Sequence, residues 1–348
     1  MSSREPTSSR EPTSSRVSVV IATRDRAPEL LGTLERMSQL PEHPRVVVVD
    51  NGSRDGTPDA VRSAFPAFQV VALPTNRGAA GRNIGARLAT TAYVALSDDD
   101  SWWAPGALDR AVEILERNPS LALVAARVLV GPQETIDPTS VQMEASRPSP
   151  VSPGARQVLG FLGCGAVVRR DAYLSVGGFH PRLGIGGEEE LLAMDLSAAG
   201  WELAYVPDVV CHHHPSTARD TSQRRRLLVR NGLWVVWLRL PLVAAVRISV
   251  ERLAGTARQP SAWSGAAQAL AGLPWIHRQR QVVPPAVEAA RRRIRSDERD
   301  DLRRTDGRPG PGRDSDHQDP NNSGPKSGGY GDHFSDQSDH LAAGRPGG

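Results

Sequence analysis

Residues 17–53 read VSVVIATRDRAPELLGTLERMSQLPEHPRVVVVDNGS, and this stretch decides the fold class. It opens on a short run rich in β-branched residues, as in a strand that is buried on both faces. An apolar helical stripe from Leu30 to Met37 follows, and residues 46–49 form a second buried run. A strand, a helix and another buried strand in this order are typical of a parallel sheet covered by helices.

The same alternation continues along the chain. Apolar runs at residues 68–73, 93–96 and 121–130 are further predicted strands, with predicted helices at residues 78–90 and 105–116. We therefore expect an α/β fold in which an open, mostly parallel, Rossmann-like sheet carries helices on both faces. Ligands of such sheets bind outside the carboxyl ends of the strands, which is where the polar clusters of this chain fall.

The second half of the chain is less regular. Residues 163–168 and 202–206 read as strands that flank a helix at residues 188–199. The Pro-, Ser- and Gly-rich segment at residues 131–157 has no periodicity and predicts a long functional or disordered loop.

The composition narrows the class of protein. Residues 1–16 hold a duplicated polar hexamer and residues 296–348 hardly any large apolar side chain, so both ends are expected to be disordered. The formal net charge of +3 argues against a nucleic-acid partner. Only two cysteines and no visible secretory signal favour the cytoplasm. The longest apolar stretch, residues 233–250, contains two arginines and a proline and makes a poor membrane-spanning helix.

The acidic triplet Asp98–Asp99–Asp100 directly follows a predicted buried strand and precedes two tryptophans. If the triplet continues the extended strand, the alternation of side chains places Asp98 and Asp100 on one face. Two carboxylates there can hold a divalent cation, which stabilises the charge of a departing nucleotide diphosphate. An isolated triplet would read as a solvated turn, but this position favours the metal site.

Further polar residues lie at the end of the second predicted strand and around the start of a predicted helix. Asp50 closes the run VVVVD, where a carboxylate either accepts hydrogen bonds from a ribose or base edge or merely initiates a turn. Asn76 and Arg82 bracket the start of a predicted helix, where arginine calls for an anionic partner, either a diphosphate or the acidic triplet. The absence of G-x-G-x-x-G after the first strand argues against a nicotinamide or flavin enzyme.

Three glutamates at residues 188–190 open the helix predicted at residues 188–199, directly after Gly186 and Gly187. Acidic residues stabilise the first turn of a helix, so capping explains them. Successive helical side chains point about 100° apart, and glycines let a substrate approach the backbone. One of the three could equally remove a proton from an acceptor hydroxyl as a general base.

Two segments follow the last predicted strand. His212 and His214 share one face of the strand end, where a histidine either completes the metal site or is an ordinary polar residue. Residues 222–240 mix arginines with leucines and tryptophans, as in an amphipathic helix. Such a helix suits an anionic membrane surface, or it packs back on the core with a basic rim.

Over roughly residues 17–240 the chain resembles the family 2 glycosyltransferases of the GT-A fold. The resemblance rests on the number, order and spacing of these motifs: VSVVIATRDR at 17–26, VVVVDNGSRDGT at 46–57, NRGAAGRNIGA at 76–86, ALSDDD at 95–100, GGF at 177–179 and EEELLAMDLSAAGW at 188–201. It implies a nucleotide-sugar-binding half at residues 17–130, an acceptor and catalytic half at 131–220, and a helical C-terminal extension at 221–295.

The resemblance also implies roles for individual residues. The donor would be contacted by Thr23, Arg26, Asp50, Asn76, Arg82 and Asp98. Asp100 or Asp99 would hold Mg²⁺ or Mn²⁺ under the diphosphate. The Glu-Asp pair usual in this family falls on Glu188 and Glu189, which makes Glu189 the expected base, although this chain has glutamate where aspartate is frequent.

The implied activity is transfer of a sugar from a nucleotide-diphosphate-sugar to an acceptor hydroxyl, with inversion at the anomeric carbon. The tail resembles those of relatives that glycosylate lipid-linked or cell-envelope acceptors, which suggests work at the inner face of the plasma membrane. One alternative is a nucleotidyltransferase, although IATRDR lacks its glycine-rich phosphate loop. The other is a non-catalytic protein that binds sugar nucleotides.

Overall fold

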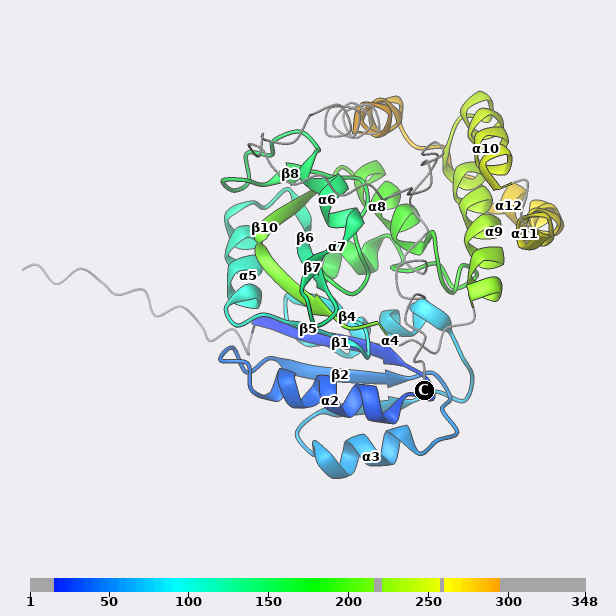
Figure 1. Ribbon diagram of the computed structural model, residues 1–348. Coiled ribbons are helices and arrows are strands. Elements are labelled where there is room, and N and C mark those ends of the chain that lie inside the picture. The colour runs from blue at the N-terminus through cyan, green and yellow to red at the C-terminus, as the bar shows by residue number, and fades with distance from the viewer. Residues whose placement is uncertain (1–15, 216–220, 257–259, 295–348) are drawn as a thin grey trace, which may run out of the picture.

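The computed structural model describes residues 16–215, 221–256 and 260–294 (Figure 1). The expectations for the polar repeat, beyond Arg16 itself, and for the tail at residues 296–348 concern residues outside these ranges. The strands are β1 (Val17–Thr23), β2 (Arg45–Asp50), β3 (Gln69–Ala72), β4 (Tyr93–Ser97), β5 (Ser101–Trp103), β6 (Leu121–Val130), β7 (Thr135–Ile136), β8 (Arg156–Gln157), β9 (Ala166–Arg169) and β10 (Glu202–His213). The helices are α2 (Ala27–Ser38), α3 (Thr57–Ala64), the 3-10 turn η1 (Gly78–Ala80), α4 (Gly81–Leu88), α5 (Ala107–Arg117), α6 (Pro138–Glu144), α7 (Arg170–Ser175), α8 (Glu188–Ala198), α9 (Thr221–Arg239), α10 (Leu242–Thr256), α11 (Pro260–Ala271) and α12 (Leu273–Gln279).

These strands form one sheet in the order β3-β2-β1-β4-β9-β6-β10-β5. The first four strands of this order are parallel, as the strand–helix alternation predicts. Antiparallel pairing enters with β9, which lies between β4 and β6, and with β5 at the edge beside β10. The predicted α/β sheet is therefore confirmed, and its second half is mixed.

Apolar side chains fill both faces of the sheet. In β1, Val19 and Ile21 belong to the core under α2, α3 and α5, whereas Val20 belongs to the core under α4, α7 and α8. Each fully buried valine or isoleucine stabilises the fold by about 1.5–3 kcal/mol. This two-sided burial explains why the strand reads as a continuous apolar run rather than as an alternation.

Residues 131–157 are not the structureless loop that their composition predicts. The segment contains β7, α6 and β8. Asp137 caps α6 by accepting a hydrogen bond from the Thr139 backbone N–H at 2.7 Å, and Ser140 accepts one from the Val128 N–H at 3.0 Å. Elements this short carry no readable periodicity, and contacts with β6 and β10 hold them in place.

Helices α9–α12 gather on one side of the molecule, where α9 contacts α8 (Figure 1). Apolar residues of α9, among them Trp234 and Val236, pack with Leu191 and Met194 of α8. The sequence predicts that residues 222–240 either lie on a membrane surface or pack back on the core. The structure shows that they pack on the core. No helix within the described ranges combines the length and apolar character needed to cross a bilayer.

Candidate active site

The carboxyl ends of three parallel strands meet at one edge of the sheet. The register pairs Thr23 of β1 with Asp50 of β2, and Ile21 with Ser97 at the end of β4. Thr23 Oγ1 donates a hydrogen bond of 2.8 Å to Asp99 Oδ2, just beyond β4. Three of the predicted polar clusters are thus next to one another, as expected for this class of sheet.

The acidic triplet is a turn and does not extend the strand, so the predicted extended conformation is wrong. β4 ends at Ser97, and Ser101 closes the turn by accepting a hydrogen bond from the Asp98 N–H at 2.8 Å. The turn nevertheless brings Asp98 and Asp100 together, with ligand atoms of both within 4.8 Å of a ring nitrogen of His213. Asp99 points elsewhere, to Thr23 and to Arg26 Nε at 3.3 Å.

Of the three neighbouring histidines, the structure groups His213, rather than the predicted His212 and His214, with the acidic turn. His213 lies opposite Ser101 in the β10–β5 pairing, and its buried Nε2 is 3.2 Å from Asp100 Oδ1. His212 instead places Nδ1 3.0 Å from Glu134 Oε1, and the His214 ring lies 4.7 Å from that of Trp102. Alternation correctly separates His213 from its neighbours, but only the pairing of β10 with β5 shows which face meets the acidic turn.

The acidic turn concentrates negative charge that suits a cation. Burial raises the pKa of Asp99 to about 7, and the neighbouring carboxylates add to this shift while Arg26 opposes it. Arg26 Nη2 also lies 2.9 Å from Asp100 Oδ2. Neither ring nitrogen of His213 forms a hydrogen bond with any residue that the structure describes. Carboxylate oxygens with one imidazole nitrogen are a donor set that suits a divalent metal ion such as Mn²⁺.

Arg82 links the acidic turn to the start of α8. Its guanidinium donates hydrogen bonds to the Asp98 carboxylate and to the Ser97 carbonyl. Burial lowers the pKa of Arg82, but the carboxylates of Asp98, Glu189 and Glu188 more than offset this effect and raise it overall. Arginine at this helix start is therefore balanced by the triplet, one of the two partners that the sequence suggests.

The three glutamates of α8 diverge as the helical geometry predicts. Burial and the charge of Glu189 raise the pKa of Glu188 well above its usual range, and Glu188 Oε2 accepts no hydrogen bond from a described residue. Burial also raises the pKa of Glu189, whose Oε1 lies against the backbone of Gly163. Glu190 turns away to α10, where its Oε2 is 3.2 Å from Arg252 Nη2.

Asp50 is almost fully buried and accepts hydrogen bonds from the N–H and the hydroxyl of Ser53. Its carboxylate thus stabilises the turn after β2, which is one of the two roles that the sequence suggests for it. Asn51, which is not among the predicted site residues, donates from Nδ2 to the Gly78 carbonyl at 3.2 Å and accepts from the Arg77 N–H at 3.1 Å. The side chain of Asn76 accepts from the Gly78 N–H at 2.7 Å.

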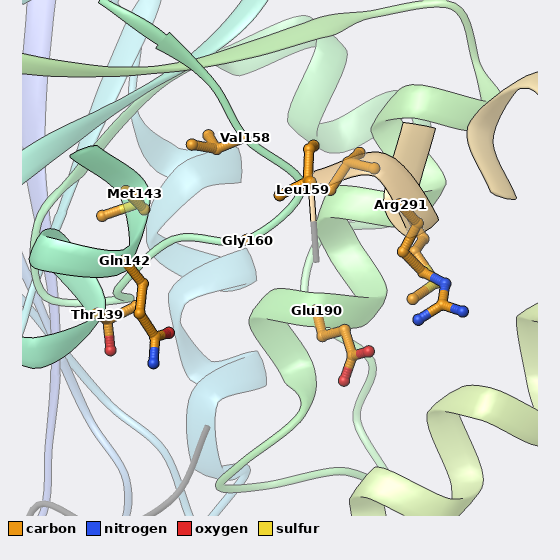
Figure 2. Close-up of a pocket in the computed structure, with 10 residues that line it drawn as sticks. Thr139, Gln142, Met143, Val158, Leu159, Gly160, Glu190 and Arg291 are labelled. Carbon is orange, nitrogen blue, oxygen red and sulfur yellow. The ribbon is translucent and has the colours of Figure 1, made fainter. Parts of the chain in front are cut away.

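A separate pocket lies between α6, α8 and the helical segment at residues 285–294 (Figure 2). Its lining is mainly apolar. Glu190 and Arg291 carry their charged groups on the same side of it (Figure 2).

The model of glycosyl transferase family 2 matches residues 18–177, from β1 past the acidic turn to the end of α7. The chain belongs to this family. This family 2 glycosyltransferase is therefore an enzyme that transfers a sugar from a nucleotide-sugar donor, which decides against the two alternative functions.

Related proteins of known name agree with the family. The chain is 29% identical to the N-acetylglucosaminyl-diphospho-decaprenol L-rhamnosyltransferase of Mycobacterium tuberculosis (strain ATCC 25618 / H37Rv), over 59% of this chain and 78% of that protein. It is 32% identical to the pre-mycofactocin glycosyltransferase of the same strain, over 60% of this chain and 45% of that protein.

Solved structures show the same fold. The mannosyltransferase PcManGT from Pyrobaculum calidifontis, in complex with GDP-Man and Mn²⁺, is 22% identical with a TM-score of 0.50, covering 82% of this chain and 87% of that one. GalNAc-T7 with UDP, GalNAc and Mn²⁺ is 16% identical with a TM-score of 0.52, covering 69% of this chain and 51% of that one. The GT-A fold expected from the motifs is confirmed.

Proposed function

We propose that this glycosyltransferase moves a sugar from a nucleoside-diphosphate-sugar to an acceptor hydroxyl with inversion at the anomeric carbon. Residues 17–130 bind the donor, and residues 131–220 supply the base and shape the acceptor site. The observation that carries the proposal is the grouping of Asp98, Asp100 and His213, connected through Arg82 to Glu188 and Glu189.

The donor's diphosphate would lie over the acidic turn. Asp98, Asp100 and His213 would hold Mg²⁺ or Mn²⁺, which when bound offsets the negative charge of the departing diphosphate. Arg82 adds a fixed positive charge beside Asp98. Thr23 and Arg26 hold Asp99 and Asp100 in position, while Asp50 and Asn76 border the nucleotide end of the site.

Glu189 is our choice of general base. Its raised pKa brings the carboxylate closer to neutral pH, where a base accepts a proton more effectively. A Cβ on Gly163 would lie 2.9 Å from Glu189 Oε1, so the glycine is what allows the carboxylate to take this position. Glu189 would take the proton of the acceptor hydroxyl as its oxygen attacks the anomeric carbon, and this single displacement inverts the centre.

The acceptor is proposed to be a glycan or a lipid-linked saccharide of the cell envelope. The name of the rhamnosyltransferase relative includes a diphospho-decaprenol carrier, an acceptor that would reside in a membrane. On α10, exposed apolar side chains recur about one turn apart, beside the exposed Arg247: Leu242, Val243, Val246 and Val250. This face suits an anionic bilayer, at the cytoplasmic side of the plasma membrane.

The test is turnover of a panel of nucleotide sugars with Mn²⁺, Mg²⁺ or chelator. We expect Asp100→Ala and Glu189→Gln to lower transfer on the order of 100-fold or more. Glu189→Gln should still bind a nucleoside diphosphate in calorimetry. Glu190→Gln is the matched control, because Glu190 sits on the same helix but faces Arg252. Unchanged turnover in both Asp100→Ala and Glu189→Gln would contradict the proposal.

A further inference from the structure

The segment that leads into the proposed base has little conformational preference of its own. Gly184, Gly186 and Gly187 all adopt positive φ values of 71°, 84° and 83°, and Glu188 follows at once. Glycine populates this region readily but also leaves it readily, so such a segment samples many conformations unless other residues hold it. The direction of the Glu188 and Glu189 carboxylates therefore depends on contacts from outside the segment.

Asn231 of α9 makes those contacts. Its side chain is fully buried, and Nδ2 donates to three carbonyls of the segment, those of Leu183 at 2.6 Å, Ile185 at 2.8 Å and Gly186 at 2.8 Å. An amide group has two N–H donors, so at least one is shared between carbonyls. Arg230 Nε donates to Asn231 Oδ1 at 2.9 Å, which fixes the orientation of the amide.

Side-chain packing reinforces this clamp. A Cβ on Gly187 would lie 3.4 Å from Asn231 Cβ and 3.3 Å from Val235 Cγ2, and one on Gly186 would overlap Leu228. The glycines are therefore needed both for their positive φ values and for the close approach of α9. Helix and segment fit together at van der Waals contact.

The other side of the segment contacts residues 78 and 79, which belong to the half of the domain proposed to bind the donor. The Ala79 N–H donates to the Gly184 carbonyl at 2.9 Å, and a Cβ on Gly78 would come within 2.7 Å of Gly184 Cα. Gly78 and Ala79 belong to η1, which leads into α4 and Arg82. The segment at residues 183–187 is thus held between α9 and the residues that approach the donor.

We propose that Asn231 is a positioning residue for catalysis, which holds the proposed base against the donor through the backbone of residues 183–187. This inference rests on the proposed function, because it assigns the carboxylates of Glu188 and Glu189 the role of base. It also makes the helical extension a part of the active site. Misplacement of a catalytic group by about 1 Å can lower a rate by on the order of 100-fold.

The experiment compares Asn231→Ala and Asn231→Asp in the full chain with Asp195→Asn. Asp195 joins the same two helices through Arg239, with Oδ2 3.0 Å from Nη2, but at the far end of α8 from the base. All three variants should lose thermal stability. We expect only the Asn231 variants to lose kcat, by on the order of 10- to 100-fold, with donor KM and nucleoside-diphosphate binding changed less than about threefold.

Asn231→Asp keeps the size of the side chain but loses both amide N–H donors and retains at most one O–H donor when protonated, so it carries the test if Asn231→Ala does not fold. Equal kcat losses for Asn231 and Asp195 variants of equal stability would overturn the inference and leave the proposed function intact. Glu189→Gln and Glu188→Gln are measured in parallel. If both glutamine variants transferred sugar at the wild-type rate, neither glutamate would be the base, and both the proposed base and this inference would be wrong.

Discussion

Buried carboxylates dominate the chemistry of individual side chains in this enzyme. Glu188 and Glu189 lie side by side at the start of α8, and burial raises the pKa of both. Arg82 compensates part of this cost, since it interacts with both glutamates and with Asp98, and Arg224 adds to the effect at Glu189. A site that is destabilised in this way gains a stronger base at the expense of folding stability.

Glu188→Gln should stabilise the protein, and more so at high pH. A raised pKa means that the folded state favours the protonated carboxyl, so wild-type stability falls as pH rises from the ordinary glutamate value of about 4.3 to the folded-state value. Glutamine mimics the protonated form and avoids this loss, which is about 1.4 kcal/mol for each unit of upward shift. Thermal midpoints of both proteins, measured at about pH 5 and pH 8, test this. A difference between the two thermal midpoints that becomes smaller as the pH rises would contradict the prediction.

His213→Ala should weaken Mn²⁺ binding by roughly 10-fold or more, because it removes one of three grouped ligand atoms. His212→Ala is the matched control, since His212 faces Glu134 one position earlier on the same strand. Manganese titration followed by calorimetry gives the affinity directly. Equal affinity in the two variants would exclude His213 from the metal site.

Among the helices and strands, the long strand β10 and the helix α9 do the most to complete the site. β10 pairs with β6 along its length, with register shifts between Glu202 and Leu203 and between Val206 and Val210, and its last residues also pair with β5 on the opposite edge. This second pairing places His213 beside the acidic turn. From the other side, α9 holds the entry to α8 through Asn231.

Substitution by alanine should change stability in opposite directions at two helical glycines, one in α4 that is packed tightly on the sheet and one in α2 that is not. A Cβ on Gly85 would overlap Val20 of β1 and lie 3.1 Å from Val49 Cγ2, so Gly85→Ala should destabilise by about 1–3 kcal/mol. Gly32, in the middle of α2, has only Arg36 Nη1 within reach at 3.8 Å. Gly32→Ala should therefore stabilise by about 0.5–1 kcal/mol through helix propensity. Urea denaturation of both variants tests the pair, and a shift of the same sign would refute it.

In the molecule as a whole, the C-terminal helices combine two surfaces. Their inner side packs on α8, whereas α10 presents apolar side chains outward, with Val243 84% exposed. A cluster of large apolar side chains with this degree of exposure marks a surface that contacts a membrane or a protein partner. We therefore expect the helices that we propose to position the base also to bring it to a membrane-borne acceptor.

Val243→Glu should reduce co-sedimentation with vesicles that contain an anionic phospholipid by roughly fivefold or more, because a carboxylate on the apolar face is repelled by the lipid charge. Val141→Glu makes the same exchange on α6, at a valine that is 47% exposed and lies outside the helical extension, and should leave binding unchanged. Equal loss in both variants, or no binding of the wild type, would refute membrane docking by α10.

The strand–helix alternation, the position of the acidic triplet directly after a buried strand and the glutamates at the start of α8 are readable from the amino-acid sequence, because each follows from neighbours a few positions apart. Apolar runs report burial on both faces of a sheet, and the carboxyl ends of parallel strands must meet at one edge. These local rules predict Asp98 and Asp100 at the carboxyl end of a strand, whereas Glu189 as the base follows from the family resemblance and stays a prediction.

Only the tertiary structure decided which histidine joins Asp100, how β9 enters the sheet and what α9 does for the base. Alternation along a strand states that His213 faces away from His212, but the pairing of β10 with β5 sets which of them meets the acidic turn. Likewise, no pattern in the sequence reveals that Asn231 holds the carbonyls before Glu188. Such contacts join residues that are distant in the chain, and the packing of whole elements determines them.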